Sequence, residues 1–146
     1  MNSESIPELL VRPNPWNHKC ELARVTKNDN PAFKIVEAAR KVHRTLGPGF
    51  LENIYNKALV AELRTSGIPV QREKQIKIWY GSQVVGQHRL DIVVGDVIVE
   101  LKANRGIAGV HKAQMRSYLQ ASSQSCGVII NFGMPELEWE LVRTTD

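Results

Sequence analysis

Two runs of β-branched residues, 92–94 and 97–99, stand on either side of Gly95-Asp96. Such a pair between two apolar runs predicts a β-hairpin with a two-residue turn. Because side chains alternate along a strand, one face of this hairpin is expected to be wholly apolar and covered by other elements. The members of that face are Leu90, Ile92, Val94, Val97, Val99 and Leu101.

The other face of the hairpin ends in charged residues. In the register set by the turn, Asp91 lies opposite Glu100, with their Cβ atoms roughly 4.5–5.5 Å apart. Like charges at that distance repel each other, and burial makes the repulsion worse. Lys102 lies two residues beyond Glu100 and therefore points to the same face. The hairpin is expected to present Asp, Glu and Lys side by side.

Before the hairpin, apolar residues recur at helical spacing in two segments. The first helix is expected to begin at Asn30, as its cap, and Pro31, and to end at the Gly-Pro-Gly break over 47–49. The second is expected over about 50–66 and stops at Gly67. The residues expected to be buried are Phe33, Ile35, Val36, Ala39, Val42 and Leu46 in the first helix, and Leu51, Ile54, Tyr55, Ala58, Leu59 and Leu63 in the second.

The remaining segments predict further strands and one more helix. Residues 70–80 alternate as a strand, and a turn joins them to the strand that carries Asp91, with a bulge expected at Gly86. A polar loop over 104–109 precedes a helix over about 110–121, a central buried strand over 126–132 and an edge strand over 136–142. Trp79 and Trp139 are expected to pack on edge strands, and base-stacking platforms are the less favoured alternative. The order predicts a sheet with helices on at least one face in one domain, 30–146, after an N-terminal arm, 1–29.

The net charge of +4 is unevenly distributed. Residues 34–116 carry 14 Lys and Arg against 7 Asp and Glu, which is +7, whereas 117–146 carry one Arg against four acids. A basic middle suits a polyanion such as nucleic acid, and an ordinary solvated basic surface is the alternative. No apolar run is long enough to span a membrane, and two cysteines, Cys20 and Cys126, are too few for a disulfide framework. A cytoplasmic chain with free thiols and no membrane contact is expected.

The pattern D-x8-E-x-K formed by Asp91, Glu100 and Lys102 suits the hydrolysis of a phosphodiester. That reaction needs a hard divalent cation to neutralise charge on the phosphate and a water held in line for attack. Carboxylates are the ligands that Mg²⁺ prefers, and a neighbouring lysine can position the water or stabilise the charged transition state. The alternative is a hairpin end with solvated charges and a surface pair between Glu100 and Lys102.

Other residues can contribute to such a site. Glu52 lies in the first turn of its helix, where the helix dipole favours an acid, or it supplies a third carboxylate. Gln114 and Tyr118 share a face of the third helix with His111. Gln114 could bind a ligand of the site or a phosphate, and Tyr118 could contact the substrate. Taken alone, the helix favours the alternative of a partly buried Tyr with a polar neighbour. Three other histidines are expected to play no part in a metal site, namely His18, His43 and His88.

Several segments resemble one known family. The segment Gly49-Phe50-Leu51-Glu52-Asn53-Ile54-Tyr55 resembles the signature of the GxxExxY family, within the PD-(D/E)XK nuclease superfamily. Segments 42–49, 89–91, 97–103, 111–119 and 129–133 resemble the same family in the same order, so the resemblance covers about residues 31–143. Segment 114–118 is also similar to the Q-x-x-x-Y motif of the RecB-type branch.

The resemblance implies an α/β (α+β) fold with a restriction-endonuclease-like αβββαβ core, in which helices flank a central mixed sheet. Carried over, Asp91 and Glu100 are metal ligands, Lys102 is the catalytic lysine, and Glu52 is the acid from the first core helix. Gln114 and Tyr118 are the accessory pair, and Leu90 stands where the superfamily's name has Pro.

The activity implied is a nuclease dependent on Mg²⁺ or Mn²⁺ that acts on nucleic acid, with DNA expected before RNA and the oligomeric state left open. Two alternatives remain. One is a non-catalytic module that binds nucleic acid or protein and keeps the fold, and the other is a structural or regulatory subunit that acts through residues 1–29.

Overall fold

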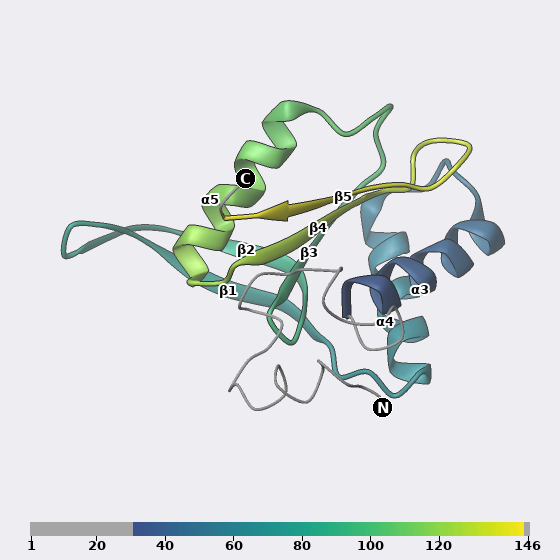
Figure 1. Cartoon of the computed structure of the whole chain (residues 1–146), viewed down its shortest axis with the longest axis horizontal. Coiled ribbons are helices and arrows are strands. Elements are labelled where there is room, and N and C mark those ends of the chain that lie inside the picture. The colour runs from purple at the N-terminus through teal and green to yellow at the C-terminus, as the bar shows by residue number, and fades with distance from the viewer. Residues whose placement is uncertain (1–30, 145–146) are drawn as a thin grey trace, which may run out of the picture.

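A computed structural model describes residues 31–144 of the chain. Three helices and five strands follow one another along these residues (Figure 1). Their order from α4 to β4 is the αβββαβ core, with α3 before it and β5 after it, so the expected fold class is confirmed. The elements are α3 (Pro31–Leu46), α4 (Glu52–Thr65), β1 (Gln71–Tyr80), β2 (Gln83–Val94), β3 (Val97–Lys102), α5 (Gly109–Ser122), β4 (Cys126–Asn131) and β5 (Glu138–Arg143).

The five strands form one mixed sheet in the order β1-β2-β3-β4-β5. The pairs β1 with β2, β2 with β3 and β4 with β5 are antiparallel, whereas β3 and β4 are parallel. A parallel pair needs a crossover connection, which α5 supplies. The predicted hairpin register is confirmed, because Val94 pairs with Val97 and Ile92 with Val99.

Helices cover both faces of the sheet (Figure 1). One core cluster joins α3 and α4 to the sheet face that carries Ile92, Val94, Val97, Val99 and Leu101. A second cluster lies on the α5 side and includes Leu90, Val93, Ile98, Met115 and Leu119. Leu90 was expected on the first face, and that prediction was wrong.

The burial expected at the start of α4 was also partly wrong. Leu51 and Ile54 were expected to be buried, but they are 75% and 40% exposed. The helix begins at Glu52, so Leu51 lies just before it as the N-cap residue, and the buried stripe starts at Tyr55.

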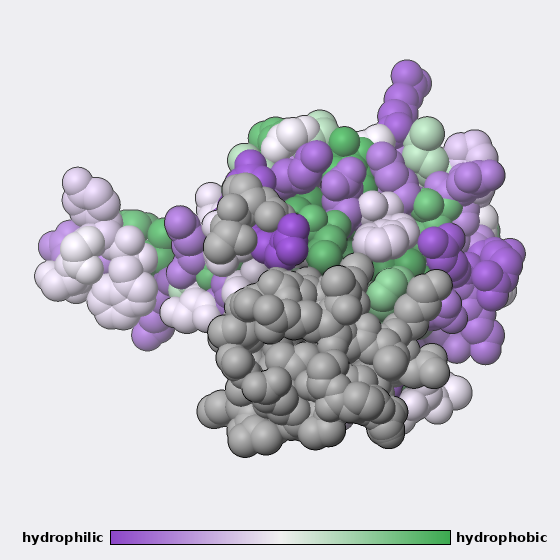
Figure 2. Space-filling view, viewed as in Figure 1, coloured by the Kyte–Doolittle hydropathy of each residue, from purple (hydrophilic) through white to green (hydrophobic). Residues whose placement is uncertain are grey.

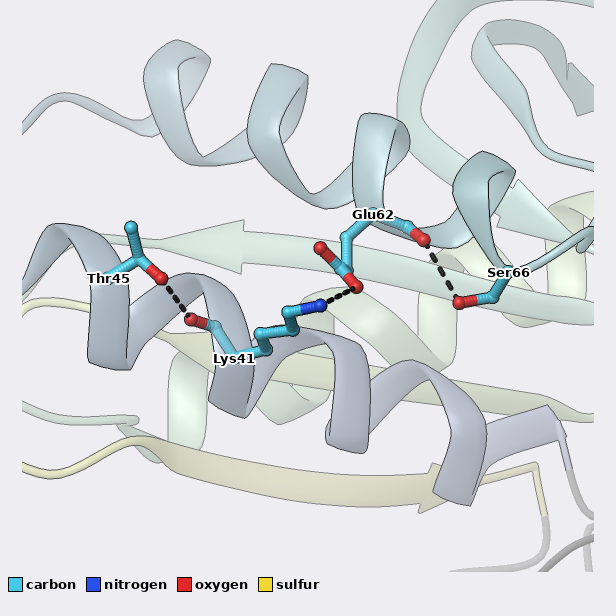
Figure 3. A network of polar contacts seen from close by, with 4 residues as sticks. All are labelled: Lys41, Thr45, Glu62 and Ser66. Atoms are coloured by element: carbon cyan, nitrogen blue, oxygen red, sulfur yellow. Dashed lines mark hydrogen bonds and ion pairs between the residues drawn. The ribbon is translucent and has the colours of Figure 1, made fainter.

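Farther along the two helices, the Lys41 ammonium lies 3.1 Å from the Glu62 carboxylate and joins α3 to α4 at the surface (Figure 3). An exposed ion pair of this kind contributes little, so apolar packing holds the two helices together.

The structure bears on two expectations from composition, namely free thiols and the absence of a membrane-spanning segment. Cys126 is buried in β4 and is disulfide-bonded, which contradicts the expectation of free thiols. Cys20, the other cysteine, lies outside the described residues, as does the whole segment 1–29 that was expected to form an arm. None of the helices described within residues 31–144 combines the length and apolar composition that a membrane crossing requires.

Candidate active site

The open end of the β2–β3 hairpin is where the two predicted carboxylates meet. The last ladder pair before this end is Ile92 with Val99. Beyond it, the Leu101 N–H donates to Asp91 Oδ2 at 3.1 Å, and the Asp91 N–H donates to Glu100 Oε1 at 3.5 Å. Side-chain carboxylates therefore take the place of the next carbonyl acceptors, and the two strands separate where the acids lie.

An irregularity in the neighbouring strand accompanies this change. Arg72 pairs with Ile92 and Lys74 with Leu90, so Glu73 and Asp91 are left out of the β1–β2 ladder. Glu73 has a φ of 56°, in the left-handed region that few residues other than glycine adopt. Alternation shifts by one residue at this point. Leu90 consequently moves to the α5 face of the sheet.

Both acids are in environments that oppose their charge. Glu100 is 8% exposed, and burial, followed by the nearby charge of Asp91, raises its pKa to about 7. Burial also raises the pKa of Asp91, while the Leu101 N–H and the charge of Lys102 act in the opposite direction. Lys102 likewise lowers the pKa of Glu100. The charges of Asp91 and Lys102 both act on Glu100, so the three residues predicted from the sequence lie near one another.

The backbone around Lys102 is fixed by β4 and the loop that follows β3. The Lys102 carbonyl accepts the Phe132 N–H at 2.8 Å. Fully buried Asn131 accepts the Asn104 N–H at 2.8 Å and donates to the Asn104 carbonyl at 3.1 Å and to Glu138 Oε1 at 3.0 Å. This network holds the chain directly after the lysine. Sequence reasoning assigned Asn131 no part in the site.

Two residues of the segment 49–55, Glu52 and Tyr55, have distinct positions in the structure. Tyr55 is fully buried and stacks on Phe132, with ring centroids 4.4 Å apart. Its hydroxyl donates to the Gly47 carbonyl and accepts the Phe50 N–H at 3.1 Å, so it holds the turn that leads into α4. Glu52, the first residue of the helix, is exposed, and its charge contributes to raising the pKa of Asp91. The third predicted acid thus lies within electrostatic range of Asp91.

Helix α5 brings one of its predicted residues to the carboxylates. Burial, together with the charges of Glu100 and Asp91, raises the pKa of Tyr118 to about 12. Gln114 is exposed one turn earlier on the same helix. The His111 Nδ1 accepts the Ala108 N–H at 3.0 Å at the start of the helix, which is a capping contact.

His88 is the site residue that sequence reasoning missed. Its ring stacks on that of Tyr118, with centroids 4.0 Å apart and an interplanar angle of 18°. Burial lowers its pKa, Asp91 opposes that change, and Lys102 adds to it. His88 and Asp91 are three apart, so regular alternation would place them on opposite faces, and only the irregularity at Asp91 brings them together. His43, by contrast, is packed as expected and contacts the Met134 carbonyl through Nε2 at 2.9 Å.

The carboxylates of Asp91 and Glu100 suit a hard divalent cation that takes few of its ligands from the protein. Within residues 31–144, no group of three or more His, Cys, Asp and Glu side chains gathers closely enough to hold a metal. Asp91 and Glu100 are nevertheless two adjacent, desolvated carboxylates, and Mg²⁺ is commonly bound by one or two carboxylates together with waters and substrate phosphates. The pair fits such an ion, because a cation offsets the burial that raises the pKa of both carboxylates and the charge of Asp91 that raises the pKa of Glu100 further.

Comparisons with known proteins agree with this fold. A family model of the PD-(D/E)XK nuclease superfamily matches residues 29–144. The crystal structure of SSO0001 is similar in fold, with a TM-score of 0.51 and 20% sequence identity, and the match covers 62% of this chain and 48% of that chain. No curated protein matches the chain. The match to the family model covers most of the chain, which therefore belongs to the PD-(D/E)XK nuclease superfamily.

Proposed function

We propose that the chain is a metal-dependent nuclease that hydrolyses phosphodiester bonds of nucleic acid. The observation that carries the proposal is the pair of desolvated carboxylates, Asp91 and Glu100, beside Lys102 at the open end of one hairpin. Membership of a superfamily that consists generally of nucleases supports the same reaction.

Each residue has a separate role in this proposal. Asp91 and Glu100 would hold Mg²⁺ or Mn²⁺, with Glu52 as a third acid from α4. The bound ion would neutralise charge on the phosphate and lower the pKa of a water. The Lys102 ammonium stabilises the charge that develops on the phosphate oxygens or orients the attacking water. The Tyr118 hydroxyl, which is protonated at neutral pH, donates a hydrogen bond to the substrate, with Gln114 as its accessory partner.

The GxxExxY family is the branch that we propose within the superfamily. Its three named residues have distinct positions here. Gly49 has a φ of 122° in the turn, Glu52 begins α4 near Asp91, and Tyr55 holds the turn in place. We further propose 30–146 as the nuclease-like domain and 1–29 as a separate N-terminal arm. DNA is the first substrate to test and RNA the second, and a nucleic-acid substrate is consistent with a cytoplasmic location.

The decisive experiment is a cleavage assay with purified protein. Labelled DNA and RNA, single- and double-stranded, are incubated with Mg²⁺, Mn²⁺ or EDTA. We expect cleavage only with a divalent cation, and we expect Lys102→Ala to lower turnover by about 10²-fold or more, because it removes a charge used in the transition state. Lys57→Ala, which changes an exposed lysine of α4, is the matched control and should cleave as the wild type does.

Two outcomes would change the proposal. Equal turnover by wild type and Lys102→Ala would show that the role given to Lys102 is wrong. A wild-type protein that binds nucleic acid but cuts none of these substrates would instead favour the non-catalytic binding module that keeps the same fold.

A further inference from the structure

The β1–β2 hairpin continues well beyond the rest of the sheet. Strand β2 pairs with β3 only through its last residues, 92–94, whereas its pairing with β1 runs on to Tyr80 and Gln83 at the tip. Residues 74–89, called the ribbon here, therefore have no third strand beside them in the described part of the chain. Figures 1 and 2 show the end of the ribbon standing out from the remaining structure.

The tip of the ribbon exposes large apolar side chains. Trp79 is 59% exposed and Tyr80 79%, and the neighbouring Val84 and Val85 are 43% and 60% exposed. Trp79 was expected to pack on an edge strand, and that prediction was wrong, because the ladder sets it against Val84 without a layer behind it. Single exposed apolar residues are ordinary, but four at one projecting tip indicate a surface that binds something.

The charges of the ribbon point to the kind of partner. Residues 74–89 contain Lys74, Lys77 and Arg89 and no acid. Lys77 is two residues from Trp79 and lies on the same face, and Arg89 pairs with Gln75, which alternation places on that face as well. One face of the ribbon therefore carries an exposed aromatic ring at its tip and two cations between that ring and the sheet.

We propose that this face binds a single-stranded stretch of nucleic acid. A base stacks on Trp79, while phosphates lie against Lys77 and Arg89. The inference rests on the proposed nuclease function for the identity of the polyanion, and it adds the class of substrate. Proteins that bind single strands combine a cationic track with aromatic side chains in this way, since unpaired bases offer their ring faces and paired bases do not.

A second copy of the chain suits this face less well. A two-fold contact sets one surface patch against the same patch of the partner. The cations Lys77 and Arg89 of one copy would then meet a patch that is itself cationic, and like charges brought together in an interface cost affinity. Nucleic acid satisfies both the ring and the cations.

The test is a binding titration of the full-length protein in EDTA, so that no turnover is needed. A labelled oligothymidine of about 20 nucleotides and a duplex of the same length are the probes. Loss of one stacked base should weaken single-strand binding by about 5- to 100-fold in Trp79→Ala. Trp79→Phe keeps a ring and should retain most of the affinity. Val110→Ala, which truncates a side chain 68% exposed on α5, is the control and should bind as the wild type does.

Two further readouts distinguish stacking from a general loss of binding. The chain has three tryptophans, and the quenching of tryptophan emission by the oligonucleotide should be largely lost in Trp79→Phe. Lys77→Gln should weaken binding, whereas Lys57→Gln, on the helical layer, should not. Melting temperatures of the variants show that each is folded, and since Trp79 and Lys77 are exposed, little change is expected there.

The outcomes separate this inference from the function on which it rests. Wild-type affinity in Trp79→Ala, or tighter binding of the duplex than of the single strand, would overturn the role of the ribbon, while cleavage by the same protein would leave the nuclease intact. A change in sedimentation coefficient with Trp79→Ala, without loss of nucleic-acid affinity, would make the ribbon a self-association surface. A wild-type protein that neither binds nor cleaves nucleic acid would overturn both proposals.

Discussion

Glu100 is the residue whose surroundings oppose its charge most strongly. It is 8% exposed, lies beside Asp91, and has a pKa raised to about 7. Near neutral pH, the metal-free protein therefore holds a proton on this carboxyl for part of the time. A cation bound by the pair would displace that proton, which makes metal affinity dependent on pH.

Glu100→Gln tests this interpretation in the metal-free protein. The pKa of Glu100 is higher in the folded state than its ordinary value of 4.5, so wild type loses stability as pH rises from about 4.5 to about 7. The Gln variant has no such loss. We expect similar free energies of unfolding at about pH 5 and a more stable variant at about pH 8, by at most about 3 kcal/mol. Urea unfolding in EDTA at the two pH values measures the difference.

Adding Mg²⁺ or Mn²⁺ to the same two proteins provides the control. Metal that binds only the folded state adds about 1.4 kcal/mol at ten times its dissociation constant. For a domain of this size that corresponds to a rise of roughly 3–6 °C in melting temperature, expected for wild type and absent in Glu100→Gln. Equal metal responses in both proteins would contradict the paired-carboxylate site.

At this scale, the sequence predicted the residues that follow regular alternation. Asp91, Glu100 and Lys102 were found from the turn at Gly95-Asp96 and a period of two, and the structure brings them together. Their chemical roles stay predictions. His88 could not be found in this way, because it reaches the carboxylates only through the irregularity that leaves Glu73 and Asp91 out of the β1–β2 ladder.

At the scale of the elements, Tyr55 fixes where α4 begins. Tyr55→Phe keeps the ring on Phe132 but removes the hydroxyl that contacts Gly47 and Phe50. Leaving buried polar groups unpaired costs about 1–3 kcal/mol, so we expect a loss of that size in the free energy of unfolding. Urea unfolding measures it, with Tyr80→Phe, at the exposed ribbon tip, as the matched control. Unchanged stability would mean that the turn before α4 does not depend on the hydroxyl.

The loop between β3 and α5 depends on a glycine. A Cβ atom on Gly133 would lie 2.3 Å from the Asn104 carbonyl oxygen and 2.6 Å from the Ala103 carbonyl carbon. These are backbone atoms and cannot turn away, so Gly133→Ala should destabilise the domain by about 1–3 kcal/mol and displace the chain after Lys102. In Gly106→Ala the nearest atom is 4.0 Å away, which makes it the control. A thermal melt of both variants decides, and equal melting temperatures would contradict the close approach.

The type and order of the elements could be predicted, but where each element ends and what packs against it could be predicted less well. Hydrophobic period identified three helices and the strands, because each buries one apolar side. It placed Leu51 and Ile54 inside, since the pattern does not show that α4 begins only at Glu52. It also gave no sign that the outer half of the β1–β2 hairpin has no layer behind it, because burial of a strand depends on its neighbours.

For the whole molecule, the uneven charge predicts how binding responds to salt. Residues 34–116 carry a net charge of +7, so nucleic-acid affinity should fall steeply as salt rises. The release of counterions from the nucleic acid favours the complex, and this contribution becomes weaker at higher salt. Titrations of labelled DNA in EDTA at increasing salt give the slope of log K against log salt, about −0.7 for each phosphate contact on a single strand. A flat dependence would remove nucleic acid as the partner.

The fold class followed from the sequence because every level agreed on it. Turn chemistry, strand alternation, helix period and the family resemblance all pointed to helices around a mixed sheet. The substrate did not follow, because neither charge nor period distinguishes DNA from RNA or a single strand from a duplex. Segment 1–29 has no periodicity, and it lies outside the described residues.

The position of β3 at the centre of the sheet has a consequence for amide hydrogen exchange. This strand is paired with β2 and β4 and is buried along almost its whole length, so its amides should exchange only when the domain unfolds. The tip of the ribbon, with Trp79, Tyr80, Val84 and Val85 exposed, lacks such cover and should open locally, at a much smaller free-energy cost. Local opening of the ribbon tip and global unfolding are then separate events. Selection can therefore change the affinity of the tip without changing the stability of the domain.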